Sequence, residues 1–155
     1  MRPSPSFTKT AARVAIIGIA TALAVLGCTA KQSPPTPQAS QTKTIEVSYD
    51  ELLNEKFITR DITLAVGDTL KVNLATSGST GFRWTEAQIG DSAVLQQTNH
   101  ETVPPTNAMP GAPSTETWTF TALKTGTTTV ATDYNQPWAG GTQGAWTFRA
   151  NVAVQ

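Results

Sequence analysis

From Lys43 onward, the chain places apolar side chains at every second position, in short runs separated by turn-forming residues. A period of two sends alternate side chains to opposite faces of a β-strand, so each run can bury one face. The runs are rich in Thr and Val, which favour strands, and turn signals recur about every 10 residues. The pattern predicts an all-β fold of two packed antiparallel sheets. The alternating sets are Ile45, Val47 and Tyr49; Ile62, Leu64 and Val66; Leu70, Val72 and Leu74; Trp118, Phe120 and Ala122; Thr128, Val130, Thr132 and Tyr134; and Trp146, Phe148, Ala150 and Val152.

Clear turn signals separate several of these runs, notably Gly67-Asp68 and Lys124-Thr125-Gly126. Asp50–Glu55 (D-E-L-L-N-E) shows mild helical character, with a simple turn as the alternative. Roughly seven strands in about 110 residues fit an immunoglobulin-like antiparallel β-sandwich. We expect one such domain over residues 43–155.

The N-terminal residues have the composition of an export signal. Arg2, Lys9 and Arg13 form a positive segment, and Val14–Gly27 is an almost uncharged apolar run of 14 residues. That run is too short to span a bilayer as a stable helix but suits the core of a signal peptide. We therefore predict that residues 1–27 are a signal peptide and that the rest of the chain is exported.

The apolar run ends at Leu26-Gly27-Cys28, which resembles a bacterial lipobox, the motif whose cysteine receives a diacylglyceryl group. The resemblance implies lipidation of Cys28 and attachment to the cell membrane, because two or more acyl chains anchor a protein stably. The alternative is an ordinary cleavage site beside a free or buried cysteine. Cys28 is the only cysteine of the sequence, so an exported domain would have no internal disulfide.

Residues 28–42 follow as a polar segment rich in Pro, Ser, Thr and Gln. Such a segment cannot bury enough apolar surface to fold, so we expect a disordered tether that holds the domain clear of the membrane. The alternative is an ordered but irregular N-terminal arm.

The charge balance argues against a nucleic-acid partner. Cleavage before Cys28 removes three of the eleven basic residues and none of the eleven acidic ones, which leaves a side-chain charge near −3. Phosphate binding requires a basic face. We expect a monomer that needs no metal or cofactor.

Three segments beside predicted strands have the character of binding loops: Ser77–Trp84 (S-G-S-T-G-F-R-W), Gly111–Ser114 (G-A-P-S) and Gln136–Trp138 (Q-P-W). They combine small, stiff and aromatic residues and contain no convincing catalytic group. Glycine permits positive φ and close backbone approach, proline lowers the entropy lost on binding, and a rigid loop tryptophan is typical of a binding hot spot. The combination favours a protein that blocks or grips a partner.

These loops resemble those of the chagasin-like inhibitors of cysteine peptidases. Ser77–Trp84 is similar to that family's N-P-T-T-G-[YF]-x-W loop, Gly111–Ser114 to its G-x-G-G loop, and Asp133–Trp138 (D-Y-N-Q-P-W) to the loop that carries R-P-[WF]. The L-K-x-G turn at Leu123–Gly126 belongs to the same pattern, and the resemblance covers roughly residues 62–154. It implies an immunoglobulin-like sandwich whose three loops gather at one end. Together they would enter the cleft of a papain-like cysteine peptidase and inhibit it tightly, reversibly and without being cleaved.

The resemblance also implies which residues contact the peptidase. Ser79 and Thr80 align with the two threonines of the family motif, where short hydroxyl side chains can approach a catalytic cysteine and histidine. Phe82 and Trp84 alternate with Arg83, so we expect both aromatic rings to point into the core. For Trp138, packing under Gly140-Gly141 is the alternative to a contact role. The implied contact residues are Ser77, Gly78, Ser79, Thr80 and Gly81; Gly111, Ala112, Pro113 and Ser114; and Gln136, Pro137 and Trp138.

The loops also depart from the family pattern in three places. Ser77-Gly78 replaces Asn-Pro, Gly111–Ser114 lacks two of the glycines, and Gln136 replaces the arginine. Each change is expected to cost on the order of 1 kcal/mol of binding, through lost preorganisation or lost charge pairing. We therefore expect weaker or altered peptidase preference.

Enzymatic activity is disfavoured. His100 is the only histidine and is expected on a surface loop, and Ser79 lacks the G-x-S-x-G spacing of a nucleophile elbow. Ala139–Gly144 is rich in glycine but lacks the strand-to-helix context of a phosphate-binding loop. The second hypothesis is a surface-anchored binding or adhesion module that uses the same sandwich for carbohydrate or protein. Inhibition of papain or a cathepsin separates the two.

Overall fold

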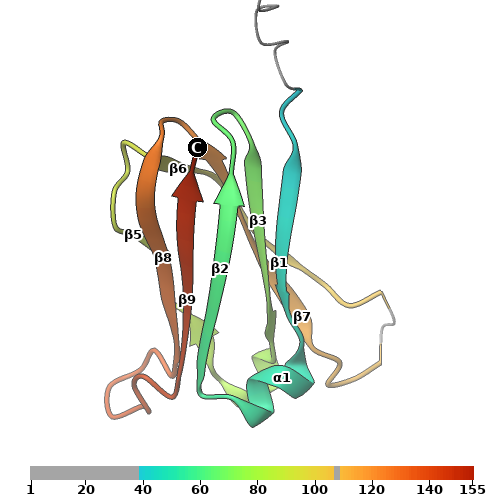
Figure 1. Ribbon diagram of the computed structural model, residues 1–155. Coiled ribbons are helices and arrows are strands. Elements are labelled where there is room, and N and C mark those ends of the chain that lie inside the picture. The colour runs from blue at the N-terminus through green and yellow to red at the C-terminus, as the bar shows by residue number, and fades with distance from the viewer. Residues whose placement is uncertain (1–38, 107–108) are drawn as a thin grey trace, which may run out of the picture. The chain divides into compact units, whose positions relative to one another are not determined.

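The computed structural model describes residues 39–106 and 109–155, which form two packed β-sheets and one short α-helix (Figure 1). The predicted immunoglobulin-like sandwich is confirmed. The predicted signal peptide, Cys28 and most of the predicted tether lie outside the described residues. The end of that tether belongs to the folded part: Thr42 begins a strand, and the backbone N–H of Gln41 donates to the Asp68 carboxylate at 2.8 Å.

The first sheet has the strand order β1-β3-β7-β6. Its strands are β1 (Thr42–Val47), β3 (Thr69–Thr76), β7 (Ser114–Ala122) and β6 (Leu95–Val103). The sequence did not predict β6, because only its first residue is buried and the polar run that follows shows no apolar alternation. An edge strand can have this composition because most of its side chains face solvent.

The second sheet has the order β2-β9-β8-β4, and a short β5 pairs separately with β8. Its strands are β2 (Phe57–Leu64), β9 (Trp146–Val154), β8 (Gly126–Asn135), β4 (Arg83–Trp84) and β5 (Gln88–Ile89). The sheets were expected to be wholly antiparallel, but two strand pairs are parallel. β1 lies parallel to β3, and β2 lies parallel to β9. The cause is that the chain crosses from β1 in one sheet to β2 in the other instead of turning back as a hairpin.

The predicted alternating sets form the core between the two sheets. Trp118, Phe120 and Phe148 are almost completely buried, and the predicted face of β8 is buried along its length. Val66 is an exception, because β2 ends at Leu64 and leaves the Val66 side chain 50% exposed in the following turn.

The helix α1 (Tyr49–Asn54) confirms the helical character expected around Asp50–Glu55. Ser48 caps its first turn, because the Ser48 hydroxyl accepts a hydrogen bond from the Glu51 backbone N–H at 3.2 Å. Ser and Glu three positions apart are typical of a helix N-terminus. Leu52 is buried in the core, whereas the neighbouring Leu53 is exposed.

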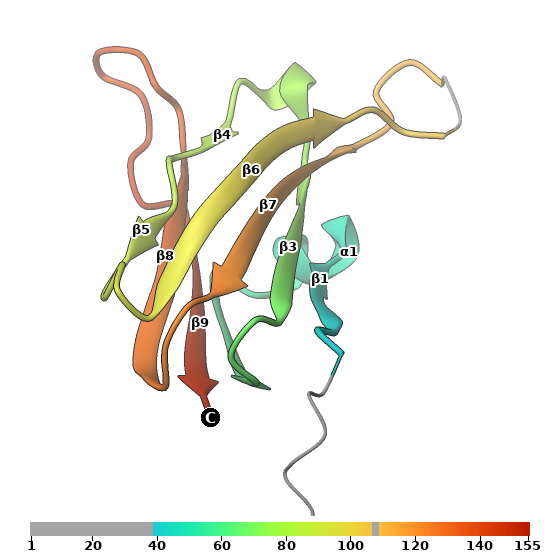
Figure 2. The same ribbon diagram turned by 90° about the horizontal axis from the view of Figure 1, so that it is seen from above.

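Strands β1, β3, β6 and β8 all end at the same end of the sandwich, so the long connections that follow them lie together there. We call this end the loop end (Figures 1 and 2). It consists of α1, of residues 77–82, 104–106, 109–113 and 136–145, which follow β3, β6 and β8, and of the adjoining strand ends at Phe57 and Val103. The opposite end, here called the far end, holds the turns at residues 65–68 and 123–125 and the C-terminus. No helix in residues 39–106 and 109–155 is long and apolar enough to cross a membrane.

Candidate functional site: the loop end

The first loop, residues 77–82, is a tight turn. Gly78–Thr80 form a 3-10 helix that Gly81 ends in the left-handed region with φ of 76°. The Thr80 hydroxyl donates to the Ser77 carbonyl oxygen at 2.7 Å, and the Thr80 backbone N–H donates to the same oxygen at 3.2 Å. Gly81 thus has the positive φ expected from the sequence, whereas Gly78 has no positive φ.

A buried tyrosine holds the base of this loop. The Tyr134 hydroxyl accepts a hydrogen bond from the Ser77 backbone N–H at 2.8 Å and lies 3.2 Å from the Thr76 hydroxyl oxygen. Ser77 is itself buried, 6% exposed. Ser77 was expected among the contact residues, but its burial places it beneath the tip, where it shapes the loop. The exposed tip consists of Gly78, Ser79 and Thr80.

The two aromatic residues after the tip point inward, as expected. Trp84 is 8% exposed, and its indole N–H donates to the Ala75 carbonyl oxygen at 3.0 Å. Phe82 is half-buried; its ring stacks on Tyr134 at a centroid distance of 5.4 Å and meets Trp146 edge-on at 5.3 Å. This aromatic cluster fixes the loop to the core.

The third loop, residues 136–145, is held closed by Gln136. The Gln136 backbone N–H donates to the Thr142 carbonyl oxygen at 2.9 Å, and its side-chain oxygen accepts from the Thr142 N–H at 3.1 Å. Gln136, which stands where the family pattern has arginine, therefore stabilises its own loop. A turn closes the tip, where the Gly141 N–H donates to the Trp138 carbonyl oxygen at 3.0 Å. Pro137 and Trp138 are exposed.

The ring of Trp138 joins the third loop to the first. A Cβ built on Gly81 would lie 2.4 Å from Cη2 and 2.9 Å from Cζ3 of Trp138, so the ring rests directly against the Gly81 backbone. The ring does not pack under Gly140-Gly141; it is the Trp138 carbonyl that meets that turn. Half of the Trp138 side chain (51%) stays exposed, and the contact holds it beside the tip of the first loop.

The described part of the second loop, residues 104–106 and 109–113, lies beside the first loop because Thr76 pairs with Ser114. Ser114 is the first residue of β7, so it belongs to the strand and not to the loop. The Ala112 N–H donates to the Met109 carbonyl oxygen at 3.1 Å across Pro110-Gly111. Gly111 has φ of 83° with open space around it, and proline followed by such a glycine is typical of a type II turn. Ala112 is half-buried and Pro113 is exposed.

His100 does not occupy a surface loop, contrary to expectation. It lies on β6, where its ring stacks on Trp118 at a centroid distance of 4.6 Å and its Nε2 lies 3.0 Å from an oxygen of Glu116. The ring covers one face of the buried Trp118 indole. Among the described residues no three His, Cys, Asp or Glu side chains are grouped as a metal site would require.

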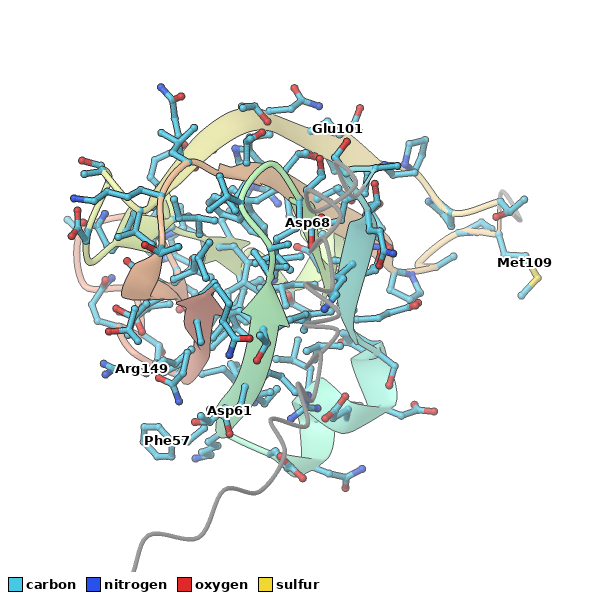
Figure 3. The ribbon with its side chains drawn as sticks, turned by 45° about the horizontal axis from the view of Figure 1, so that its top comes forward. Phe57, Asp61, Asp68, Glu101, Met109 and Arg149 are labelled. Atoms are coloured by element: carbon cyan, nitrogen blue, oxygen red, sulfur yellow. The ribbon has the colours of Figure 1, made fainter. Side chains whose placement is uncertain are left out.

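Exposed large apolar side chains are concentrated at the loop end. Of the seven in residues 39–106 and 109–155, five lie there and two lie at the far end. Those at the loop end are Leu53, Phe57, Val103, Met109 and Trp138; those at the far end are Val66 and Leu123. Figure 3 shows Phe57 and Met109 projecting from opposite sides of the molecule. The five therefore do not form one contiguous patch, but they make the loop end the more apolar of the two ends.

Of those five exposed residues, only Trp138 was expected from the sequence to contact a partner, and the role of Tyr134 was not expected. The exposure of Leu53 could have been predicted, because two adjacent leucines on a one-turn helix cannot both face the core. No local signal marked Tyr134, since its hydroxyl acts on a residue 57 positions away.

The sequence and the fold both match known peptidase inhibitors. Amoebiasin-2 of Entamoeba histolytica is 29% identical over 104 residues, which cover 67% of this chain and 85% of the relative. The solved structure of EhICP2, a cysteine protease inhibitor from Entamoeba histolytica, covers 76% of this chain and 98% of its own, with a TM-score of 0.59 and 19% identity. PbICP-C, solved in complex with falcipain-2, covers 73% of this chain and 99% of its own, with a TM-score of 0.58 and 19% identity.

The family model for chagasin family peptidase inhibitors matches residues 63–152, which contain all three loops. That match spans more than half of the chain, and the family consists of inhibitors, so the expectation that the protein is not an enzyme is confirmed. The chain belongs to the chagasin family of peptidase inhibitors (I42).

Proposed function

We propose that the protein inhibits papain-like cysteine peptidases reversibly, by inserting its loop end into the active-site cleft. The observation that carries the proposal is the contact of the Trp138 ring with Gly81, which joins two loops into one preorganised wedge. Loops already held in one arrangement lose less entropy on binding. EhICP2, a cysteine protease inhibitor, and PbICP-C, solved with falcipain-2, share the fold and support the choice of target class.

The geometry of the first loop explains how it can fill a cleft without being cut. Ser79 and Thr80 are exposed at the tip, but the backbone there is coiled into a 3-10 turn closed onto the Ser77 carbonyl. A peptidase attacks a carbonyl carbon only when it is held in a near-attack geometry. The backbone of a closed turn cannot adopt that geometry, so the loop blocks the catalytic residues sterically without being cleaved.

A titration of papain tests the proposal. The segment from Thr29 to Gln155 keeps every described strand and the helix, and residues 37–155 form one compact unit, so this form suits the assay. We expect a dose-dependent loss of papain activity that is recovered on dilution, with the inhibitor mass unchanged afterwards. No inhibition of papain or several cathepsins at micromolar protein would refute the proposal.

Two loop variants locate the contact. Trp138→Ala should weaken inhibition by roughly 30-fold, the loss of about 2 kcal/mol that is typical of an aromatic hot spot. Thr80→Ala should also weaken inhibition, whereas Thr80→Ser keeps the hydroxyl that closes the turn and should retain most of it. Wild-type inhibition by both alanine variants would mean that the contact residues are elsewhere.

We also propose that the protein acts as a monomer at the outer side of a cell membrane, held by lipid on Cys28 after removal of residues 1–27. The residues at 29–38 would then form the tether. The motif and its flanks in the sequence support this proposal. Blocking lipoprotein signal cleavage with a globomycin-type inhibitor should make the larger precursor accumulate, and Cys28→Ser should prevent lipid incorporation. Processing to the mature size in the presence of the inhibitor, or lipid incorporation that persists in Cys28→Ser, would contradict it.

A further inference from the structure

We propose that the peptidase contact extends beyond the three loops to a fourth element, α1, and to the apolar pocket between α1 and the first loop. This inference rests on the proposed function. The pocket, here called the helix pocket, is a cavity of about 140 Å³. Its apolar walls come from α1, the first loop and strands β8 and β9: Tyr49, Leu52, Leu53, Phe82, Tyr134 and Trp146.

The helix pocket is continuous with the tip of the first loop. Thr80 lines the pocket and is also an exposed residue of that tip. A partner surface that covers Thr80 therefore reaches the edge of the pocket. In Figure 1, α1 lies at the same end of the sandwich as the loops that follow β3, β6 and β8.

One exposed apolar side chain of this region is left unexplained by a three-loop contact. Leu53 forms part of the pocket and is 59% exposed. Its hydration is unfavourable and is relieved when a partner covers it. The far end offers only Val66 and Leu123 as exposed apolar residues of similar size within the described ranges, so the asymmetry favours the end that binds.

The lining indicates the chemistry of the group that the pocket accepts. Its volume is close to the roughly 150 Å³ of an apolar cavity that holds one benzene ring. The one ion pair beside it in the described residues, Arg60 with Glu51, is already formed within the protein. We therefore assign to the pocket one aromatic or branched aliphatic side chain from the rim of the peptidase cleft.

Exposed-site variants test the assignment with a matched control. Leu53→Asp places a charge at the pocket mouth and should weaken papain inhibition at least tenfold, mainly through faster dissociation. Leu123→Asp makes the same change at the far end, where the side chain is 45% exposed, and should inhibit like wild type. Leu53→Ala should weaken inhibition about threefold or more; it tests the same contact if Leu53→Asp proves unstable in thermal unfolding.

The outcomes separate this inference from the proposed function. Wild-type inhibition by both Leu53→Asp and Leu53→Ala would overturn the fourth contact and leave the three-loop wedge standing. An equal loss in Leu53→Asp and Leu123→Asp would also overturn it, because the effect would then be one of net charge. Failure of the wild-type protein to inhibit any papain-like peptidase would overturn both.

Discussion

Gly81 is the position where one added methyl group tests how the first and third loops are joined. Gly81→Ala has two separate costs. A left-handed φ of 76° costs a residue with a Cβ about 1–2 kcal/mol. In addition, the new Cβ would lie 2.4 Å from Cη2 of Trp138, which forces the ring away from its place beside the tip.

The two costs should be seen in different measurements. The Trp138 ring is half exposed and can move, so the free energy of unfolding should fall mainly by the backbone cost, about 1–2 kcal/mol in urea denaturation. The backbone strain is the same in free and bound protein and does not weaken binding by itself. Displacement of the ring does, so inhibition of papain should weaken roughly 30-fold, as expected for an aromatic hot spot.

A double-mutant cycle provides the control. In the Trp138→Ala background the ring is absent, so adding Gly81→Ala should lower stability again but change papain inhibition by no more than about threefold. If Gly81→Ala weakened inhibition equally in both backgrounds, the ring and the glycine would act independently. The reasoning that the two loops form one preorganised wedge would then be wrong.

Two further predictions concern stability. Tyr134→Phe removes the hydroxyl that accepts from the buried Ser77 N–H, and should cost about 1–3 kcal/mol in urea unfolding; an unchanged midpoint would contradict the anchoring role of Tyr134. The backbone N–H groups of Gln41 and Ala65 hold the pKa of Asp68 below its ordinary value of 3.8, despite the opposing effect of burial. Its contribution to stability is therefore complete above the unfolded-state pKa and is lost as pH falls through the lowered pKa of the folded state. The advantage of wild type over Asp68→Asn should accordingly be constant near neutral pH and shrink below about pH 4, and an advantage that grows on acidification would refute this.

The sequence predicted those features of the fold that local chemistry determines. Period-two alternation marks strands with one face in the core, as for β3, β7, β8 and β9. The helical character of Asp50–Glu55 marks the position of α1. Glycine at a turn predicts left-handed backbone, and Gly81 has it. Edge strand β6 was not predicted, because most of its side chains face solvent and it therefore lacks alternating apolar residues.

Other features depend on contacts between distant residues, which no local pattern encodes. Ser77 resembles a tip residue by its place in the motif, yet its N–H bonds the hydroxyl of Tyr134 and the residue is buried. Gln136 resembles a contact residue by alignment, yet its amide closes its own loop through Thr142. The loop order predicted which segments meet, but only the packed sandwich shows that the Trp138 ring rests on Gly81.

Hydrogen–deuterium exchange of the protein with and without papain tests the central claim most directly, because it reports which backbone segments a bound peptidase covers. The account predicts slower exchange at residues 77–82, 109–113 and 136–145. It predicts no change at residues 65–68 and 123–125, the turns of the far end. Protection of the far-end turns, or binding that leaves exchange in all three loops unchanged, would contradict the account.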